Sequence, residues 1–244
     1  MTLGMAMGTR RRSLLADVGL PVTDGLVLDL DATKLNLSDN DPVVTWPDES
    51  GEGNNATQGT ASEQPTYKTG VLNGLPVVRF DGTDDFMVAP NGVISGMSAA
   101  ASVFIVARTL TVQESSIFRS IPDDPANRFN AHLPWTDDSI HFDFGDLNGT
   151  GRISVDWGGN TSDFFAWGLM VDTNLMEIRR DGLSLESQAE SDTFAPGSME
   201  LEIGGYESDD VWHGELAQIV VYDRALTTQE REDVEAHLMS KWGL

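Results

Sequence analysis

One short stretch of the chain, Trp135-Thr136-Asp137-Asp138, combines a large aromatic side chain with two carboxylates. An indole ring offers a flat apolar surface on which a pyranose can stack, and carboxylates accept hydrogen bonds from hydroxyl groups. Trp135, Asp137 and Asp138 are therefore our candidate glycan-binding residues. The alternative interpretation is a tryptophan that packs beneath its own turn.

A second stretch carries oxygen ligands at regular spacing. Asp146, Asn148 and Thr150 occupy positions 1, 3 and 5 of a segment with glycine at position 6, as at the start of a calcium-binding loop. The glutamate that such a loop needs at position 12 is replaced by Trp157. A glycine-rich turn between two strands is the simpler interpretation. We therefore expect no cofactor, with calcium at these three residues as the alternative.

Nucleophilic catalysis finds no support in the sequence. The chain has no cysteine, which removes thiol nucleophiles, thiolate metal sites and disulfides. Its four histidines have no Gly-x-Ser-x-Gly turn that would present a serine to one of them. We expect that the chain is not an enzyme.

The charge of the chain is strongly negative and unusual in its make-up. The 244 residues include 39 Asp and Glu against 15 Lys and Arg, a net charge of −24. Aspartate outnumbers glutamate 25 to 14, and only three of the basic residues are lysine. This composition is typical of a protein that works in near-saturated salt, where a Debye length of about 3 Å at ~1 M screens self-repulsion. The alternative is an acidic protein that binds cations or a basic partner.

Nucleic acid and membrane insertion are not expected. Affinity for phosphate backbones comes from clustered Lys and Arg, and a net charge of −24 opposes it. No run of about 18 apolar residues occurs, which argues against a transmembrane helix.

The first 20 residues differ from the rest in charge. Arg10, Arg11 and Arg12 with Asp17 give this stretch a charge of +2, whereas the remaining 224 residues carry −26. Arg11 and Arg12 have the outline of a twin-arginine export signal, but the apolar stretch of about 7–15 residues that a signal needs does not follow. We expect residues 1–20 to be an extended basic arm that docks on the body of the protein or on a neighbouring subunit.

The elements that must position the candidate residues are short strands separated by Gly, Asp, Asn and Pro. Several alternate between apolar and polar residues, as in Ile140–Phe144, and Asp181-Gly182 is a two-residue hairpin signal. The predicted strands are Leu26–Leu30, Val43–Trp46, Pro76–Phe80, Phe86–Ala89, Ser102–Arg108, Arg128–Leu133, Ile140–Phe144, Arg152–Val155, Phe164–Val171, Leu175–Arg180, Glu200–Gly204 and Leu216–Tyr222. Many short strands with regular turns indicate an antiparallel sandwich.

Only the C-terminus is predicted to be helical. Thr227 and Glu230 have the spacing of a capping box. Val234, Leu238 and Trp242 then recur at i, i+4 and i+8, which gives an apolar stripe that can lie against the sandwich. The sequence predicts a helix over about 228–240 and one domain over 21–244.

Six motifs of the chain resemble the concanavalin A-like, laminin-G-type jelly rolls over about residues 25–244. They are Gly25-Leu26-Val27-Leu28-Asp29-Leu30-Asp31-Ala32, Trp46-Pro47-Asp48-Glu49-Ser50-Gly51, residues 73–85, His132-Leu133-Pro134-Trp135, His141-Phe142-Asp143-Phe144-Gly145 and residues 214–227. The motifs that begin at His132 and His141 are similar to versions of the domain in viral tail and capsid-surface proteins. The resemblance implies an all-β, antiparallel jelly-roll β-sandwich with one C-terminal helix and the N-terminal extended arm. We expect Trp46, Phe80 and Tyr222 to lie in its core.

Some jelly rolls of this shape hydrolyse glycans with carboxylates that alternate along one strand as Glu-x-Asp-x-x-Glu. That string does not occur here. Glu200 and Glu202 do alternate, but we interpret their strand as an ordinary one with a solvated face.

The resemblance implies binding of glycans or proteins at the rim of the sandwich. With the missing export signal, the basic arm and the acidic body, it leads us to expect a non-catalytic virion structural protein of a haloarchaeal tailed virus. It would be a capsid decoration, turret or tail-fibre subunit that is made in the host cytoplasm and exposed on the virion surface. The expected partners are other virion subunits through the arm, further copies in a homo-oligomer, and host-surface glycans. The alternatives are a cellular extracellular carbohydrate-binding module and a glycan hydrolase.

Overall fold

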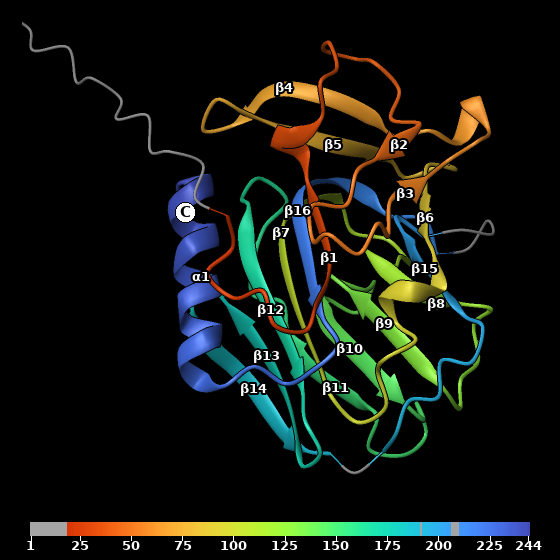
Figure 1. Ribbon diagram of the computed structural model, residues 1–244, viewed down its shortest axis with the longest axis vertical. Coiled ribbons are helices and arrows are strands. Elements are labelled where there is room, and N and C mark those ends of the chain that lie inside the picture. The colour runs from red at the N-terminus through yellow and green to blue at the C-terminus, as the bar shows by residue number, and fades with distance from the viewer. Residues whose placement is uncertain (1–18, 191, 206–209) are drawn as a thin grey trace, which may run out of the picture.

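The computed structural model describes residues 19–190, 192–205 and 210–244. In them, sixteen strands form two antiparallel sheets of eight strands each, and one α-helix follows the last strand (Figure 1). The all-β sandwich with a C-terminal helix is therefore confirmed. Residues 1–18 of the basic arm, with Arg10, Arg11 and Arg12, lie outside the described residues, and the arm stays a prediction. Within the described part of the chain, no helix has the length and apolar character that crossing a membrane requires.

The two sheets differ in which strands they contain. Sheet A contains, in spatial order, β14 (Leu183–Ala189), β13 (Leu175–Arg180), β12 (Phe165–Val171), β7 (Ala101–Thr111), β16 (His213–Tyr222), β5 (Leu75–Asp81) and β4 (Thr66–Leu72), and β1 (Leu26–Asp31) also pairs with β16. Sheet B contains β11 (Arg152–Asp156), β10 (Ser139–Gly145), β9 (Arg128–His132), β8 (Phe118–Ile121), β15 (Glu200–Ile203), β6 (Met87–Ala89), β3 (Ala56–Thr57) and β2 (Thr45–Trp46).

Four strands are absent from the predicted list, namely β3, β4, β8 and β14, and the hairpin signal at Asp181-Gly182 indicates only the last of them. In β4 the buried side chains do not alternate regularly with exposed ones, and its pairing with β5 shifts register between Lys68 and Leu72. The four residues of β8 include only two apolar side chains, and β3 has two residues in all. Short or irregular strands carry too little period-2 signal to stand out from turns.

Alternation along the strands of sheet B separates an aromatic core from a polar outer face. Phe142 and Phe144 of β10 are fully buried in the core, where the Phe129 ring lies 6.2 Å and 6.0 Å from theirs in edge-to-face contacts. His141 and Asp143, which alternate with them along the strand, must point to the opposite face of the sheet. Trp46, Phe80 and Tyr222 are fully buried, so their assignment to the core is confirmed.

The C-terminal helix α1 (Thr228–Trp242) covers part of the outer face of sheet A (Figure 1). Its capping box between Thr227 and Glu230 is present, and the helix ends at Gly243 in the left-handed conformation. The Arg179 guanidinium of β13 donates to the Glu235 carboxylate at 2.6 Å and 3.1 Å, which fixes the helix to the sheet. The prediction of 228–240 is confirmed, with two more residues at the end.

A buried polar contact joins β1, β16 and α1. The Gln218 amide donates to Asp29 Oδ1 at 2.7 Å, and Gln218 Oε1 accepts from Lys241 Nζ and Trp242 Nε1, each at 3.0 Å. Burial raises the pKa of Asp29 to about 6 against the hydrogen bond from Gln218, and the nearby Asp31 charge adds to the rise.

Asp29 gives a prediction for stability against pH. Because its folded-state pKa lies above the unfolded value of 3.8, its protonated form stabilises the fold, and that contribution is lost as the pH rises through about 6. We expect Asp29→Asn, which is neutral at every pH, to raise the free energy of unfolding at pH 7.5 by on the order of 2 kcal/mol and to flatten its decline between pH 5 and 7.5. Denaturant unfolding in ~2 M salt measures both. The exposed Asp233→Asn is the control, and parallel pH curves for Asp29→Asn and the unmodified chain would contradict this account.

Candidate functional site

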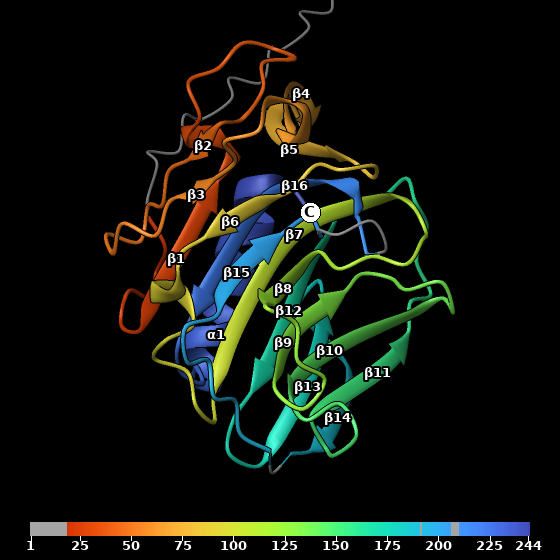
Figure 2. The same cartoon turned by 90° about the vertical axis from the view of Figure 1, so that its right-hand side faces the viewer.

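The outer face of sheet B gathers charged and polar side chains from five neighbouring strands, and Figure 2 shows β9, β10 and β11 side by side. Cross-strand register brings them together, since His141 lies opposite both His132 and Ser154, and Asp143 lies opposite both Asn130 and Arg152. We call this surface the polar face. Its members are Arg119, Arg128, Asn130, His132, His141, Asp143, Arg152, Ser154 and Glu202.

Asp143 lies at the centre of the polar face and is fully buried. The Arg152 guanidinium donates to both of its carboxylate oxygens, at 2.5 Å and 2.6 Å, and Arg128 Nη1 lies 3.6 Å away. Burial alone would raise the pKa of Asp143, but hydrogen bonds from Arg152 and His132 hold it below its ordinary value. The buried charge is thus compensated by a bidentate partner.

Glu202 corrects the expectation of a solvated face on β15. Its side chain is fully buried, and Arg119 of β8 donates to Glu202 Oε1 at 2.8 Å. The two residues lie directly opposite each other in the sheet. The prediction was wrong because the partner that allows Glu202 to be buried comes from β8, an unrecognised strand 83 residues away in the sequence.

His141 contacts Ser154 and Asp137 through its two ring nitrogens. Its Nδ1 lies 2.6 Å from Ser154 Oγ, and its Nε2 lies 3.4 Å from Asp137 Oδ2. Burial and then the Arg152 charge lower the pKa of His141, against the opposing effect of Asp137. Slight burial raises the pKa of Asp137, but the backbone hydrogen bond from Ser139 and the nearby His141 outweigh it. The pKa of Asp137 therefore lies below its ordinary value. Sequence reasoning missed His141 and Ser154 as site residues, although the alternation in Ile140–Phe144 already placed His141 on a polar face.

The structure brings two of the three predicted glycan-binding residues to the margin of the polar face. Trp135 is half-buried, and its ring meets that of His132 at 4.6 Å between centroids with an angle of 73°. Asp137 faces His141, as described above. Asp138 instead serves the turn through its backbone, with a φ of 60° and a carbonyl that accepts the Trp157 amide at 2.8 Å.

An open hollow of about 340 Å³ lies beside the polar face. It is lined by Ser139, Ser154, Val155, Asp156 and Glu186. Ser154 is shared with the His141 contact, and the Ser139 carbonyl accepts the Trp135 amide, so the hollow adjoins both. Together, Trp135, the β9–β11 part of the polar face and this hollow form the candidate site.

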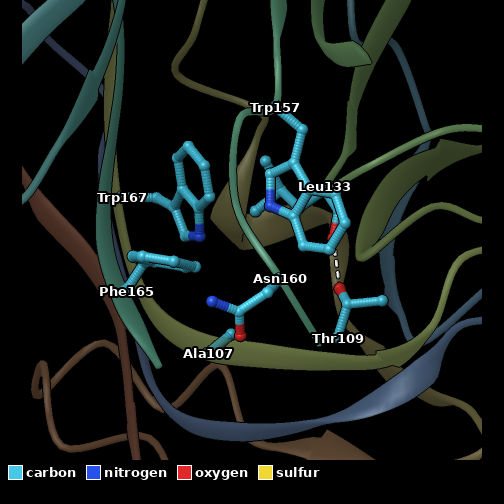
Figure 3. Close-up of a pocket in the computed structure, with 7 residues that line it drawn as sticks. All are labelled: Ala107, Thr109, Leu133, Trp157, Asn160, Phe165 and Trp167. Carbon is cyan, nitrogen blue, oxygen red and sulfur yellow. Dashed lines mark hydrogen bonds between the residues drawn. The ribbon is translucent and has the colours of Figure 1, made fainter. Parts of the chain in front are cut away.

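A second cavity lies between the two sheets and is aromatic (Figure 3). Trp157, Trp167, Phe165 and Asn160 line it, and the Thr109 hydroxyl donates to the Leu133 carbonyl at its side. Its free space of about 10 Å³ matches a single water molecule and excludes a sugar ring.

The suggested calcium loop forms the turn between β10 and β11. Asp146 Oδ1 accepts the Asn148 amide at 2.8 Å, and the Thr150 hydroxyl donates to Glu190 at 3.2 Å. These contacts are those of a turn, and calcium there stays a prediction.

A different group of carboxylates lies close together. Among the described residues, Asp81, Asp84 and Asp85 have oxygen atoms within 4.8 Å of one another. Burial, with repulsion from Asp81, raises the pKa of Asp85 to about 7.

Comparison with known proteins shows a fold and no family. No protein-family model matches the sequence, and no curated protein matches it significantly. Domain 4 of an extracellular GH43 arabinanase from Geobacillus stearothermophilus, solved with arabinotriose, is similar at a TM-score of 0.65 and 17% identity, covering 86% of this chain and 98% of that domain.

Two larger proteins contain the same sandwich. The binding domain of botulinum neurotoxin serotype D is similar at a TM-score of 0.63 and 14% identity, covering 89% of this chain and 52% of that one. Trypanosoma rangeli sialidase in complex with sialic acid is similar at a TM-score of 0.58 and 13% identity, covering 91% of this chain and 34% of that one. The chain thus spans about half of the toxin domain and a third of the sialidase, and these likenesses show the β-sandwich fold.

Proposed function

We propose that this chain binds carbohydrate at Trp135 and the adjoining hollow. The observation that carries the proposal is a half-buried tryptophan whose ring lies against His132 and whose backbone amide bonds to Ser139, a residue that lines an open space with hydroxyl and carboxylate groups in its wall. The indole supplies an apolar surface for a sugar ring, while Ser139, Asp156 and Glu186 supply hydrogen-bond partners for its hydroxyl groups. Asp137, two residues further along the same turn, adds an acceptor.

The comparisons support a carbohydrate ligand. The arabinanase domain, which matches over nearly its whole length, was solved with arabinotriose, and the sialidase was solved with sialic acid. Both are sugar complexes of proteins that share this sandwich, so the fold is compatible with the proposed role.

We further propose that the domain works on the surface of a haloarchaeal virus particle, as a capsid decoration, turret or tail-fibre subunit. The excess of aspartate and the three lysines support a high-salt setting, and a basic stretch on an acidic body suits docking between subunits. A cellular extracellular carbohydrate-binding module is the alternative, and it shares the binding site.

Carbohydrate binding is testable with two variants at the site. We expect Trp135→Ala to weaken binding at least about tenfold, or about 1.4 kcal/mol, because the stacking surface is lost, and Asp156→Asn to weaken it less. Calorimetric titration in ~2 M salt with arabinotriose, sialic acid and a panel of neutral and acidic oligosaccharides measures this. The exposed Glu232→Gln on α1 is the control. Absence of binding across the panel, or equal affinity for Trp135→Ala and the unmodified chain, would overturn the proposal.

The proposed role of the arm predicts a difference in mass. In ~2–3 M salt, where charge repulsion is screened, we expect the full chain to be oligomeric and a version lacking residues 1–20 to be a folded monomer. Light scattering with circular dichroism measures both. Oligomers of the same size with and without the arm would contradict assembly through it, and so would monomers in both cases.

A further inference from the structure

Ser154, His141 and Asp137 are arranged as a hydroxyl, an imidazole and a carboxylate in sequence. The two contacts are 2.6 Å from Ser154 Oγ to His141 Nδ1 and 3.4 Å from His141 Nε2 to Asp137 Oδ2. A carboxylate accepts only, so it favours the tautomer in which Nε2 carries the hydrogen. In the neutral imidazole, Nδ1 is then the acceptor, and Ser154 donates its hydroxyl hydrogen to it. This is the arrangement that activates a serine as a nucleophile.

The surroundings of His141 favour its neutral form. The charged and titratable groups that face it are Arg152 from β11, His132 from β9 and Asp137 from the preceding turn. Burial and the two cationic or basic neighbours lower its pKa, while Asp137 opposes them, and the balance is a pKa below the ordinary value. At neutral pH the imidazole can therefore accept a proton, as a general base must.

Ser154 is accessible to a substrate. Its side chain is exposed and lines the hollow of about 340 Å³, whereas His141 behind it is buried. Asp156 and Glu186 also line the hollow and make its wall acidic. A substrate with its own carboxylate would be repelled, so this space suits an uncharged or cationic molecule.

The backbone of β11 supplies a hydrogen-bond donor at the same place. The Phe144 amide donates to the Gly151 carbonyl, so the hydrogen-bonded pairs of β10 and β11 alternate from there, and His141 with Ser154 is a non-hydrogen-bonded pair. The Ser154 amide therefore points away from β10, toward the open edge of the sheet. A contact of Arg152 agrees with this direction. Its carbonyl, which also points away from β10, accepts a hydrogen bond from the Gln188 side chain of β14 at 2.6 Å. An outward amide on the nucleophile itself is suited to stabilise an oxyanion.

We propose that Ser154 is the nucleophile of a hydrolytic site for small, uncharged or cationic carboxylic esters, with His141 as general base and Asp137 as its positioning residue. The activity goes beyond carbohydrate binding and does not depend on it. It also departs from the expectation, drawn from the missing Gly-x-Ser-x-Gly turn, that the chain is not an enzyme, because a strand pair supplies the contact that such a turn would otherwise make.

The reaction balances with water as the co-substrate. Ser154 Oγ attacks the ester carbonyl and its proton passes to His141 Nδ1, which gives a tetrahedral oxyanion facing the Ser154 amide. The intermediate collapses, the alkoxide leaves with the proton from His141, and an acyl-serine remains. Water then attacks the acyl group with His141 as base, and release of the carboxylic acid returns the proton to Ser154.

The test uses p-nitrophenyl acetate as substrate for the full chain in ~2 M salt. We expect Ser154→Ala and His141→Gln to lower kcat/KM at least about 100-fold, while the exposed Ser187→Ala on β14 keeps the full rate. A fluorophosphonate should label Ser154, as located by mass spectrometry of peptides. Equal rates for Ser154→Ala and the unmodified chain, or a label on another residue only, would overturn the proposal. Because no sugar is present, this result is independent of carbohydrate binding.

Asp137 is tested through the pH profile. The rate should rise with pH as His141 loses its proton and should level off near neutrality. Asp137→Asn removes the charge that favours the protonated imidazole, so it should lower the plateau and move the midpoint to lower pH. An unchanged midpoint would contradict a positioning role. Circular dichroism of each variant controls for folding.

Discussion

Charged side chains that lose water on the outer face of sheet B must find partners there, and much of the molecule follows from this requirement. Asp143 and Glu202 are fully buried, and each meets an arginine from the neighbouring strand. The pairing holds only in one register, because a slip of one residue along β10 would turn Asp143 into the core and Phe142 toward solvent. The aromatic core and the polar face therefore depend on each other.

The same network positions the candidate site. His132 is held by the Ser115 carbonyl, 2.9 Å from Nδ1, and Trp135 rests on its ring. Arg152 donates to Asp143 and contributes to the electrostatics of His141. A stacking surface and a serine–histidine contact thus share one rigid support, as a precise binding or catalytic site requires. The proposed sugar-binding and ester-hydrolysing roles share the hollow and Asp137, and Trp135 belongs to the sugar-binding role alone.

Local pattern predicted much of the fold, and distant pairing limited the rest. Alternation predicted β10 and the faces of its residues, and the capping box predicted α1. Trp135 and Asp137 were found from residue type and proximity in sequence. Glu202 was misjudged, and Ser154 with His141 was missed, since their partners depend on strand order and register that periodicity does not contain. The role of Asp138 in the turn became visible only in its backbone conformation.

The central claim is that the polar face beside Trp135 is where ligands bind. A two-dimensional ¹H–¹⁵N NMR titration with mixed oligosaccharides in ~2 M salt tests it most directly. We expect the Trp135 indole N–H and the amides of residues 135–139 and 152–156 to shift, while the buried indole of Trp242 does not. Shifts confined to other surfaces, such as the cavity between β1 and α1 around Asp29 and Gln218, would contradict it.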